Sequence, residues 1–248
     1  MDKELDGPLR PFVPGRIWVS EYGLRYGGMR LQARATIVRL AGGELFVHSP
    51  CPLDPALQGQ LLALGPVAHI VAPGTYHYFH VAAWKQAYPD AQLWLCPGLR
   101  EKRSELPEGE VLSDQAPPAW RDELEQVVIQ GNRVIWEVLF FDRASHTLIV
   151  TDSIECYGDD TPNVPFLLKA WWHLFRMWNR PAPAPEYGLG WRDRVAARDS
   201  LERALAWDFD RIVLSHGDLI ETDGHAQAER AWQNMLRAPG KPASQQRS

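Results

Sequence analysis

Residues 69–80 read HIVAPGTYHYFH, and this stretch joins a short apolar strand to two histidines directly behind it. We predict a buried strand over residues 69–72, because four residues rich in aliphatic side chains precede a strong turn signal. The Pro-Gly pair that follows ends the strand, since proline cannot donate to a sheet ladder. His77 and His80 then stand three residues apart in one loop, so both imidazoles could face one cavity.

Short strands and helices continue on both sides of this stretch. Upstream, residues 16–48 read as a meander of short strands with glycine turns, and a helix is predicted between Asp54 and Gly65. Downstream, the predicted helices cover residues 79–87, 166–178, 192–206 and 224–236, and the predicted strands cover residues 92–95, 124–129, 134–141, 147–151 and 211–214. The element order is therefore meander, β-α, meander, then α-β-α.

This order predicts an α/β fold of a particular kind. Two halves that each combine a mixed sheet with flanking helices are typical of a four-layer α/β/β/α sandwich with its two sheets face to face. A doubly wound parallel sheet is the alternative, which the short connections within residues 16–48 and 124–151 disfavour. We predict one domain over residues 1–239 and a disordered polar tail over residues 240–248.

Composition excludes several classes of protein. The chain has 248 residues, 45% of them hydrophobic, and its formal net charge of -5 gives no electrostatic footprint for nucleic acid or an anionic membrane. The longest apolar run, residues 164–178, contains Lys169, His173 and Arg176, so we expect no membrane span. Three widely separated cysteines and the lack of a signal peptide predict a cytoplasmic protein. The expected partner is a small-molecule substrate or ligand, and the oligomeric state stays open.

Histidine or aspartate follows an apolar strand at several places. These positions are His48, the loop with His77 and His80, Asp152, and His216. A lone histidine at a strand end is more often a hydrogen-bonded residue than a ligand, but the repeated pattern favours a metal site. Other chemistries have less support, because the chain has no phosphate-binding loop, dinucleotide fingerprint or G-x-S-x-G elbow.

The motifs together resemble those of the metallo-β-lactamase superfamily, and in particular a branch described as a domain of unknown function. The stretches that carry the resemblance are residues 36–40, 45–50, 69–73 with His77, 148–152, 206–211 and 215–217. The superfamily's hallmark is H-x-H-x-D-H in the loop after a strand. This chain keeps it only in degenerate form, with Thr75, His77, Phe79 and His80 at the four positions in one register and Pro73, Thr75, His77 and Tyr78 in the other.

The resemblance implies a metal centre with fewer protein ligands than the superfamily's hallmark provides. His77 is the firmest loop ligand, Asp152 resembles the bridging aspartate, and His216 resembles the final histidine. His48 and His80 are additional candidates, although relatives often carry an aspartate where His48 stands. Three ligands and an open position suit one divalent metal, either catalytic zinc or, with two histidines and a carboxylate, iron(II).

Two classes of function follow. The first is a metallo-hydrolase that cleaves an ester, thioester, lactone or phosphoester with a metal-activated water, with Asp152, His77 and Tyr78 as catalytic residues; Tyr76 is the alternative to Tyr78 for stabilising an oxyanion. The second is a metal-free relative that binds a small ligand or a protein, and an iron-dependent redox enzyme is a further alternative. The tryptophan-rich segment 166–178 could be a lid, an interface, a lipid-facing patch or a packed helix.

Overall fold

The computed structural model describes residues 9–26, 28–162 and 164–237, and their strands form two sheets. The first sheet contains, in spatial order, β1 (Arg10–Val13), β2 (Ile17–Tyr26), β3 (Met29–Arg39), β4 (Leu45–His48), β5 (Val67–Ala72), β6 (Gln92–Leu95) and β7 (Glu110–Val111). The second contains β11 (Arg211–Leu214), β10 (Thr147–Val150), β9 (Val138–Asp142) and β8 (Leu124–Val128). The predicted tail over residues 240–248 lies outside the described residues.

Both sheets are mixed, as predicted. Strands β1 to β4 are antiparallel, whereas β4 to β7 are parallel and are joined by crossover segments. In the second sheet β8, β9 and β10 are antiparallel, and β10 is parallel to β11. The meander and the parallel part meet at β4, so a doubly wound parallel sheet is excluded.

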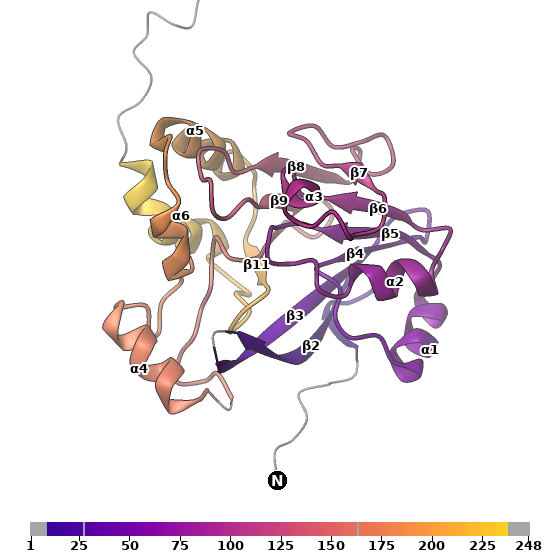
Figure 1. Ribbon diagram of the computed structural model, residues 1–248, viewed down its shortest axis with the longest axis horizontal. Helices are drawn as coiled ribbons and strands as arrows, with labels where there is room; N and C mark the ends of the chain where they lie inside the picture. Colours follow the sequence, from indigo (N-terminus) through magenta and orange to yellow (C-terminus); the bar gives the residue numbers. More distant parts are fainter. Residues whose placement is uncertain (1–8, 27, 163, 238–248) are drawn as a thin grey trace, which may run out of the picture.

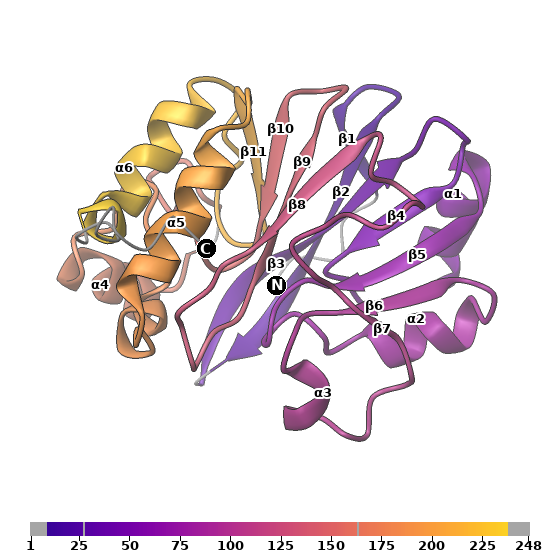
Figure 2. The same ribbon diagram turned by 90° about the horizontal axis from the view of Figure 1, so that it is seen from above.

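Helices cover the outer faces of the two sheets, which completes the four layers (Figure 1). In Figure 2, α1 (Pro55–Leu64) and α2 (Val81–Ala87) lie outside the first sheet, and α5 (Arg194–Leu205) and α6 (Gly224–Leu236) lie outside the second. The shorter elements are α3 (Leu99–Lys102), α4 (Phe166–Leu174) and the 3₁₀ turn η1 (Pro185–Leu189). Asp54 begins α1 as predicted, because its carboxylate accepts a hydrogen bond from the Leu57 amide at 2.7 Å.

Alternating side chains of β9 explain the layering. Phe140 points between the sheets, where its ring lies 5.2 Å from that of Phe46 on β4. Leu139 and Phe141 point to the other face and pack in the cluster beneath α5 and α6. Because both faces of this strand are buried, its sequence is continuously apolar rather than alternating.

Several boundaries differ from the prediction. The helix predicted over residues 166–178 ends at Leu174, and Arg176 and Asn179 then adopt positive φ values of 55° and 60°. The strand predicted over residues 134–141 begins only at Val138, because the preceding residues pair with the loop after β5. The segment 79–80 precedes α2 rather than forming its first turn. Strands β1 and β7 and the elements α3 and η1 were not predicted.

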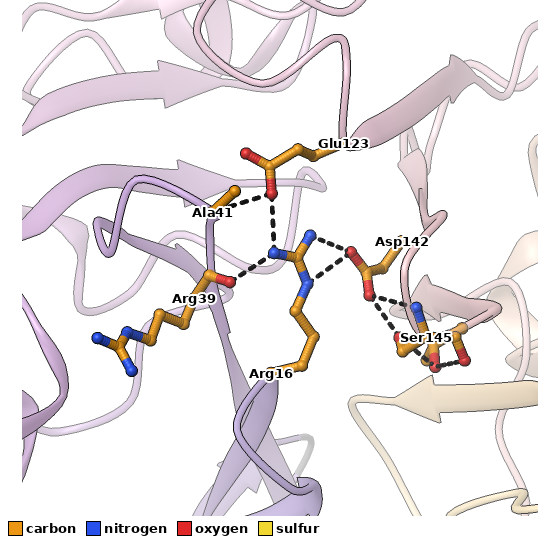
Figure 3. Close-up of polar contacts among 7 residues, drawn as sticks. Arg16, Arg39, Ala41, Glu123, Asp142 and Ser145 are labelled. Atoms are coloured by element: carbon orange, nitrogen blue, oxygen red, sulfur yellow. Dashed lines mark hydrogen bonds and ion pairs between the residues drawn. The ribbon is translucent and has the colours of Figure 1, made fainter.

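A partly buried ion-pair network connects the sheets at the end of β9 that is remote from the predicted metal site (Figure 3). Arg16 donates through Nε to Asp142 at 3.0 Å, and through Nη1 to Glu123 at 2.8 Å and to the carbonyl of Arg39 at 2.6 Å. The Asp142 carboxylate also accepts from the Ser145 amide at 3.0 Å. Both oxygens of the buried Asp142 carboxylate therefore accept hydrogen bonds, which offsets the cost of burying it.

Candidate metal centre

Three of the predicted ligands lie together at one end of the sandwich. Ligand atoms of His77, Asp152 and His216 all lie within 4.8 Å of one another. Asp152 Oδ1 is 3.1 Å from His77 Nε2 and 3.5 Å from His216 Nε2. Asp152 and His216 follow the neighbouring parallel strands β10 and β11, whose carboxyl ends share one edge of the sheet. His77 reaches this edge from the loop after β5 in the other sheet.

In both histidines, the ring nitrogen that does not face Asp152 is hydrogen-bonded to another residue. His216 Nδ1 lies 2.9 Å from the carbonyl of Gln32, and because a carbonyl only accepts, Nδ1 carries the proton and Nε2 keeps its lone pair. His77 Nδ1 lies 2.7 Å from Ser49 Oγ, which also turns Nε2 towards Asp152. This arrangement matches metal-binding histidines, whose other nitrogen is fixed by a neighbouring group.

The backbone around His216 is fixed by residues that are distant in sequence. Arg34 of β3 is buried and donates to the carbonyls of Leu214 at 2.5 Å and Gly217 at 2.7 Å, while it also binds Glu21 at 2.9 Å. Gly217 has φ +85°, and a Cβ there would lie 1.9 Å from the carbonyl oxygen of Cys156. Only glycine fits this close approach.

Glu137 fixes the turn that carries Asp152. Its fully buried carboxylate accepts from the amides of Thr151 at 2.6 Å and Ser153 at 2.8 Å, which flank Asp152 on both sides. The Ser153 hydroxyl at 3.0 Å and the Tyr187 hydroxyl at 2.8 Å complete four donors. Burial and the charge of Asp152 raise the pKa of Glu137, and these donors oppose the rise.

The electrostatics of the group favour a cation. Burial alone would raise the pKa of Asp152, but His77 and His216 hold it below its usual value. Burial, with the nearby His77, lowers the pKa of His216 to about 4. At neutral pH the group therefore offers a carboxylate and an unprotonated imidazole at His216, which is the state that metal binding requires. Two histidines and a carboxylate fit a single zinc or iron(II) ion.

A mainly apolar cavity of about 70 Å³ opens beside this group. Its lining consists of Leu24, Leu31, Tyr76, Ile135, Asp152, Glu155, Leu168, Trp171, Trp172, Ala184, Glu186 and His216. Glu155 Oε2 and Trp172 Nε1 are buried without a hydrogen-bond partner among the described residues. Burial and the neighbouring carboxylates raise the pKa of Glu155 well above its usual value. Besides Asp152 and His216, the cavity lining therefore includes an acceptor or acid at Glu155 and an N–H donor at Trp172 that have no partner among the described residues.

The structure places the other predicted residues outside this group of three. The His80 ring packs edge-on against Tyr22 at 5.5 Å. Tyr78 stacks on Phe79 at 4.7 Å and does not line the cavity beside the group, whereas Tyr76 does. Burial raises the pKa of the Cys156 thiol to about 11, as expected of an inert cysteine. The ligand and catalytic roles assigned from sequence stay predictions.

His48 is fully buried, and neither ring nitrogen has a hydrogen-bond partner among the described residues. Its ring packs edge-on against Phe140 at 5.6 Å. Burial lowers the pKa of His48 to about 3, so the folded protein binds fewer protons here than the unfolded chain, whose histidines titrate near 6.5. The free energy of unfolding therefore falls as the pH falls from about 6.5 towards 3, because only the unfolded chain takes up a proton at this histidine.

We expect His48→Leu to unfold with an unchanged or larger free energy at pH 7, because no hydrogen bond is lost. Between pH 7 and 4.5 its stability should fall by about 2.5 kcal/mol less than that of the wild type. Urea unfolding at the two pH values measures both quantities. Parallel pH dependence in the two proteins would contradict the assignment, and a loss of bound metal would instead make His48 a ligand.

The fold and the His-Asp-His group define a protein of the metallo-β-lactamase fold. Structures similar to this chain include the DIM-1 metallo-β-lactamase exposed to ceftazidime (TM-score 0.62, 11% identity, covering 94% of this chain and 99% of that chain). The mono-zinc form of FIM-1 from Pseudomonas aeruginosa gives TM-score 0.60 and 11% identity, covering 94% and 98%. The metallo-β-lactamase from Pontibacter korlensis gives 0.60 and 12%, covering 91% and 98%.

A match to a family model assigns the chain to one family. The model described as "Domain of unknown function (DUF4336)" matches residues 14–186, and the chain belongs to that family. No curated protein sequence matches the chain. The comparisons thus confirm the predicted metallo-β-lactamase fold and the predicted branch of unknown function.

Proposed function

We propose that the protein is a metal-dependent hydrolase with a single zinc ion bound by His77, Asp152 and His216. The observation that carries the proposal is the convergence of two histidine Nε2 atoms on one buried carboxylate oxygen, at 3.1 and 3.5 Å. When bound by three such ligands, zinc supplies Lewis acidity and makes a nucleophile from water at neutral pH. The mono-zinc form of FIM-1 gives a precedent for one ion in this fold.

The residues around the group have two further roles, which are to orient the ligands and to bind the substrate. Ser49 and the Gln32 carbonyl orient the two imidazoles, and Glu137 orients Asp152 through the neighbouring backbone. The cavity beside them accepts the apolar part of an ester, thioester, lactone or phosphoester and keeps bulk water away from it. Glu155 and Trp172 lie where they can hydrogen-bond a polar group of that substrate.

The same cavity also favours a second candidate, a module that binds a small ligand without a metal. A buried acceptor or acid at Glu155 and a buried donor at Trp172, both without partners among the described residues, are costly unless a ligand or water satisfies them. This reading needs no chemistry from His77, Asp152 and His216. Iron-dependent redox chemistry is a third outcome, which differs from the first in the identity of the metal.

Metal content and chelator sensitivity test the proposal. The untagged protein is expressed with zinc and iron both supplied, its metals are determined by elemental analysis, and esters, thioesters, lactones and phosphoesters are screened for hydrolysis. We expect near-stoichiometric zinc, and hydrolysis that a chelator abolishes and added zinc restores. Stoichiometric iron would redirect the search to redox substrates. Protein without metal under all these conditions would overturn the hydrolase proposal in favour of the binding module.

A further inference from the structure

Helix α4 exposes apolar side chains on the face that points away from the sheets. Phe166 is 81% exposed, Leu167 69%, and Leu174 72%, and Phe175 directly after the helix is 45% exposed. We call these four residues the α4 patch. On the opposite face Leu168 and Trp172 are buried, so the helix is apolar on both faces. Such a helix lowers its free energy when something other than water covers its outer face.

Two arginines lie next to the α4 patch, although the chain as a whole is acidic. Residues 161–185 contain Lys169, Arg176 and Arg180, whereas Asp159, Asp160 and Glu186 lie just outside this range and the formal net charge of the chain is -5. Arg176 and Arg180 are exposed. Lys169 lies over the ring of Trp178, with its Nζ 4.6 Å from the ring centre, and it pairs with Asp159 at 3.7 Å, so Arg176 and Arg180 carry the positive charge next to the patch. The overall charge, which predicts no attraction to an anionic membrane, therefore does not describe this part of the surface.

The place of α4 in the fold and its short length indicate what kind of surface could cover it. Helix α4 lies at the periphery of the molecule (Figure 1), and its outer side chains are exposed. None of the helices in the described residues is long and apolar enough to cross a membrane. A short helix with aromatic and aliphatic residues on one face and cations beside them is instead typical of segments that lie in the plane of the membrane interface.

We propose that the α4 patch docks the protein on the surface of a bilayer that contains anionic lipids. The patch enters the boundary between headgroups and acyl chains, and the flanking arginines bind lipid phosphates. A second copy of the chain fits the patch less well, because two such surfaces face to face would bring the same cations together. The proposal does not rest on the hydrolase function, since it uses none of the metal-site residues.

Vesicle sedimentation tests the proposal with the full chain. The probes are vesicles of phosphatidylcholine alone and vesicles that also contain phosphatidylglycerol. We expect binding to the second kind, weakened by salt, and at least about a tenfold weaker affinity for Leu167→Ser. The matched control is Leu62→Ser, because Leu62 is 82% exposed and its helix, α1, lies at the other end of the molecule from α4 (Figure 2); this variant should bind like the wild type.

Two charge-reversal variants measure how much electrostatic attraction contributes to vesicle binding. Arg176→Glu should weaken binding to the anionic vesicles, while Arg230→Glu on α6 should weaken it much less. Phe166→Ser serves as a second apolar variant, and circular dichroism checks that each variant is folded. Equal binding to both kinds of vesicle, or no effect of the α4 variants, would overturn the proposal. Dimerisation that Leu167→Ser abolishes, without vesicle binding, would make the patch an interface between copies and would overturn it as well.

Discussion

Alanine in place of His77 is expected to remove the bound metal and about a thousandfold of the hydrolytic rate, whereas alanine in place of His80 should preserve both. The two histidines belong to one loop and are three residues apart, so they form a matched pair. His77 Nε2 lies 3.1 Å from Asp152 Oδ1, within the group of three. His80 packs against Tyr22 outside that group. Removing one of three ligands leaves too few for a stable site.

Elemental analysis and steady-state kinetics on the two variants make the comparison, and thermal unfolding of the metal-free proteins shows whether each is folded. Asp152→Ala should behave like His77→Ala, because it removes the only anion of the group. Metal retained by His77→Ala at the wild-type level would refute the ligand assignment. Equal losses in His77→Ala and His80→Ala would mean that the loop as a whole, rather than one imidazole, maintains the site.

The sequence predicted the elements of the fold where local pattern alone decides them. Strands β6 and β11 and helix α6 begin and end where the apolar periodicity and the turn residues indicate. The prediction missed element boundaries at places where contacts between residues distant in sequence determine where a strand begins. The segment before β9 reads as strand, yet it pairs with the loop after β5 through Gly74 and Glu137. Periodicity contains no information about that pairing.

The candidate site was likewise predictable where a residue directly follows an apolar strand, and not where its place depends on long-range contacts. Asp152 and His216 follow apolar strands, and parallel strands bring such positions to one edge of a sheet. The resemblance singled out His77, but the local pattern alone did not separate it from His80, because that choice depends on how the loop after β5 folds against the segment before β9. Arg34 and Glu137 were missed, although Glu137 is a single charge within the apolar run 134–141, which indicates a buried polar role.

Glutamine in place of Glu137 is expected to lower the free energy of unfolding by about 3 kcal/mol and to weaken metal binding 10- to 100-fold. Each carboxylate oxygen accepts one backbone amide, from Thr151 on Oε1 and from Ser153 on Oε2. Either orientation of a glutamine amide therefore places its NH₂ group against a backbone N–H. Because these amides flank Asp152, the mismatch displaces the carboxylate that the two histidines face.

Graded controls distinguish this positioning role from general destabilisation. Tyr187→Phe removes one of the four donors and should cost about 1 kcal/mol, with little effect on metal affinity, because Tyr187 does not bind the turn backbone. Glu229→Gln, on an exposed position of α6, should change neither quantity. The measurements are urea unfolding of the metal-free protein and zinc titration against a competing chelator. A metal affinity that stays at the wild-type level in Glu137→Gln would show that Asp152 keeps its place without this carboxylate, and that Glu137 serves stability alone.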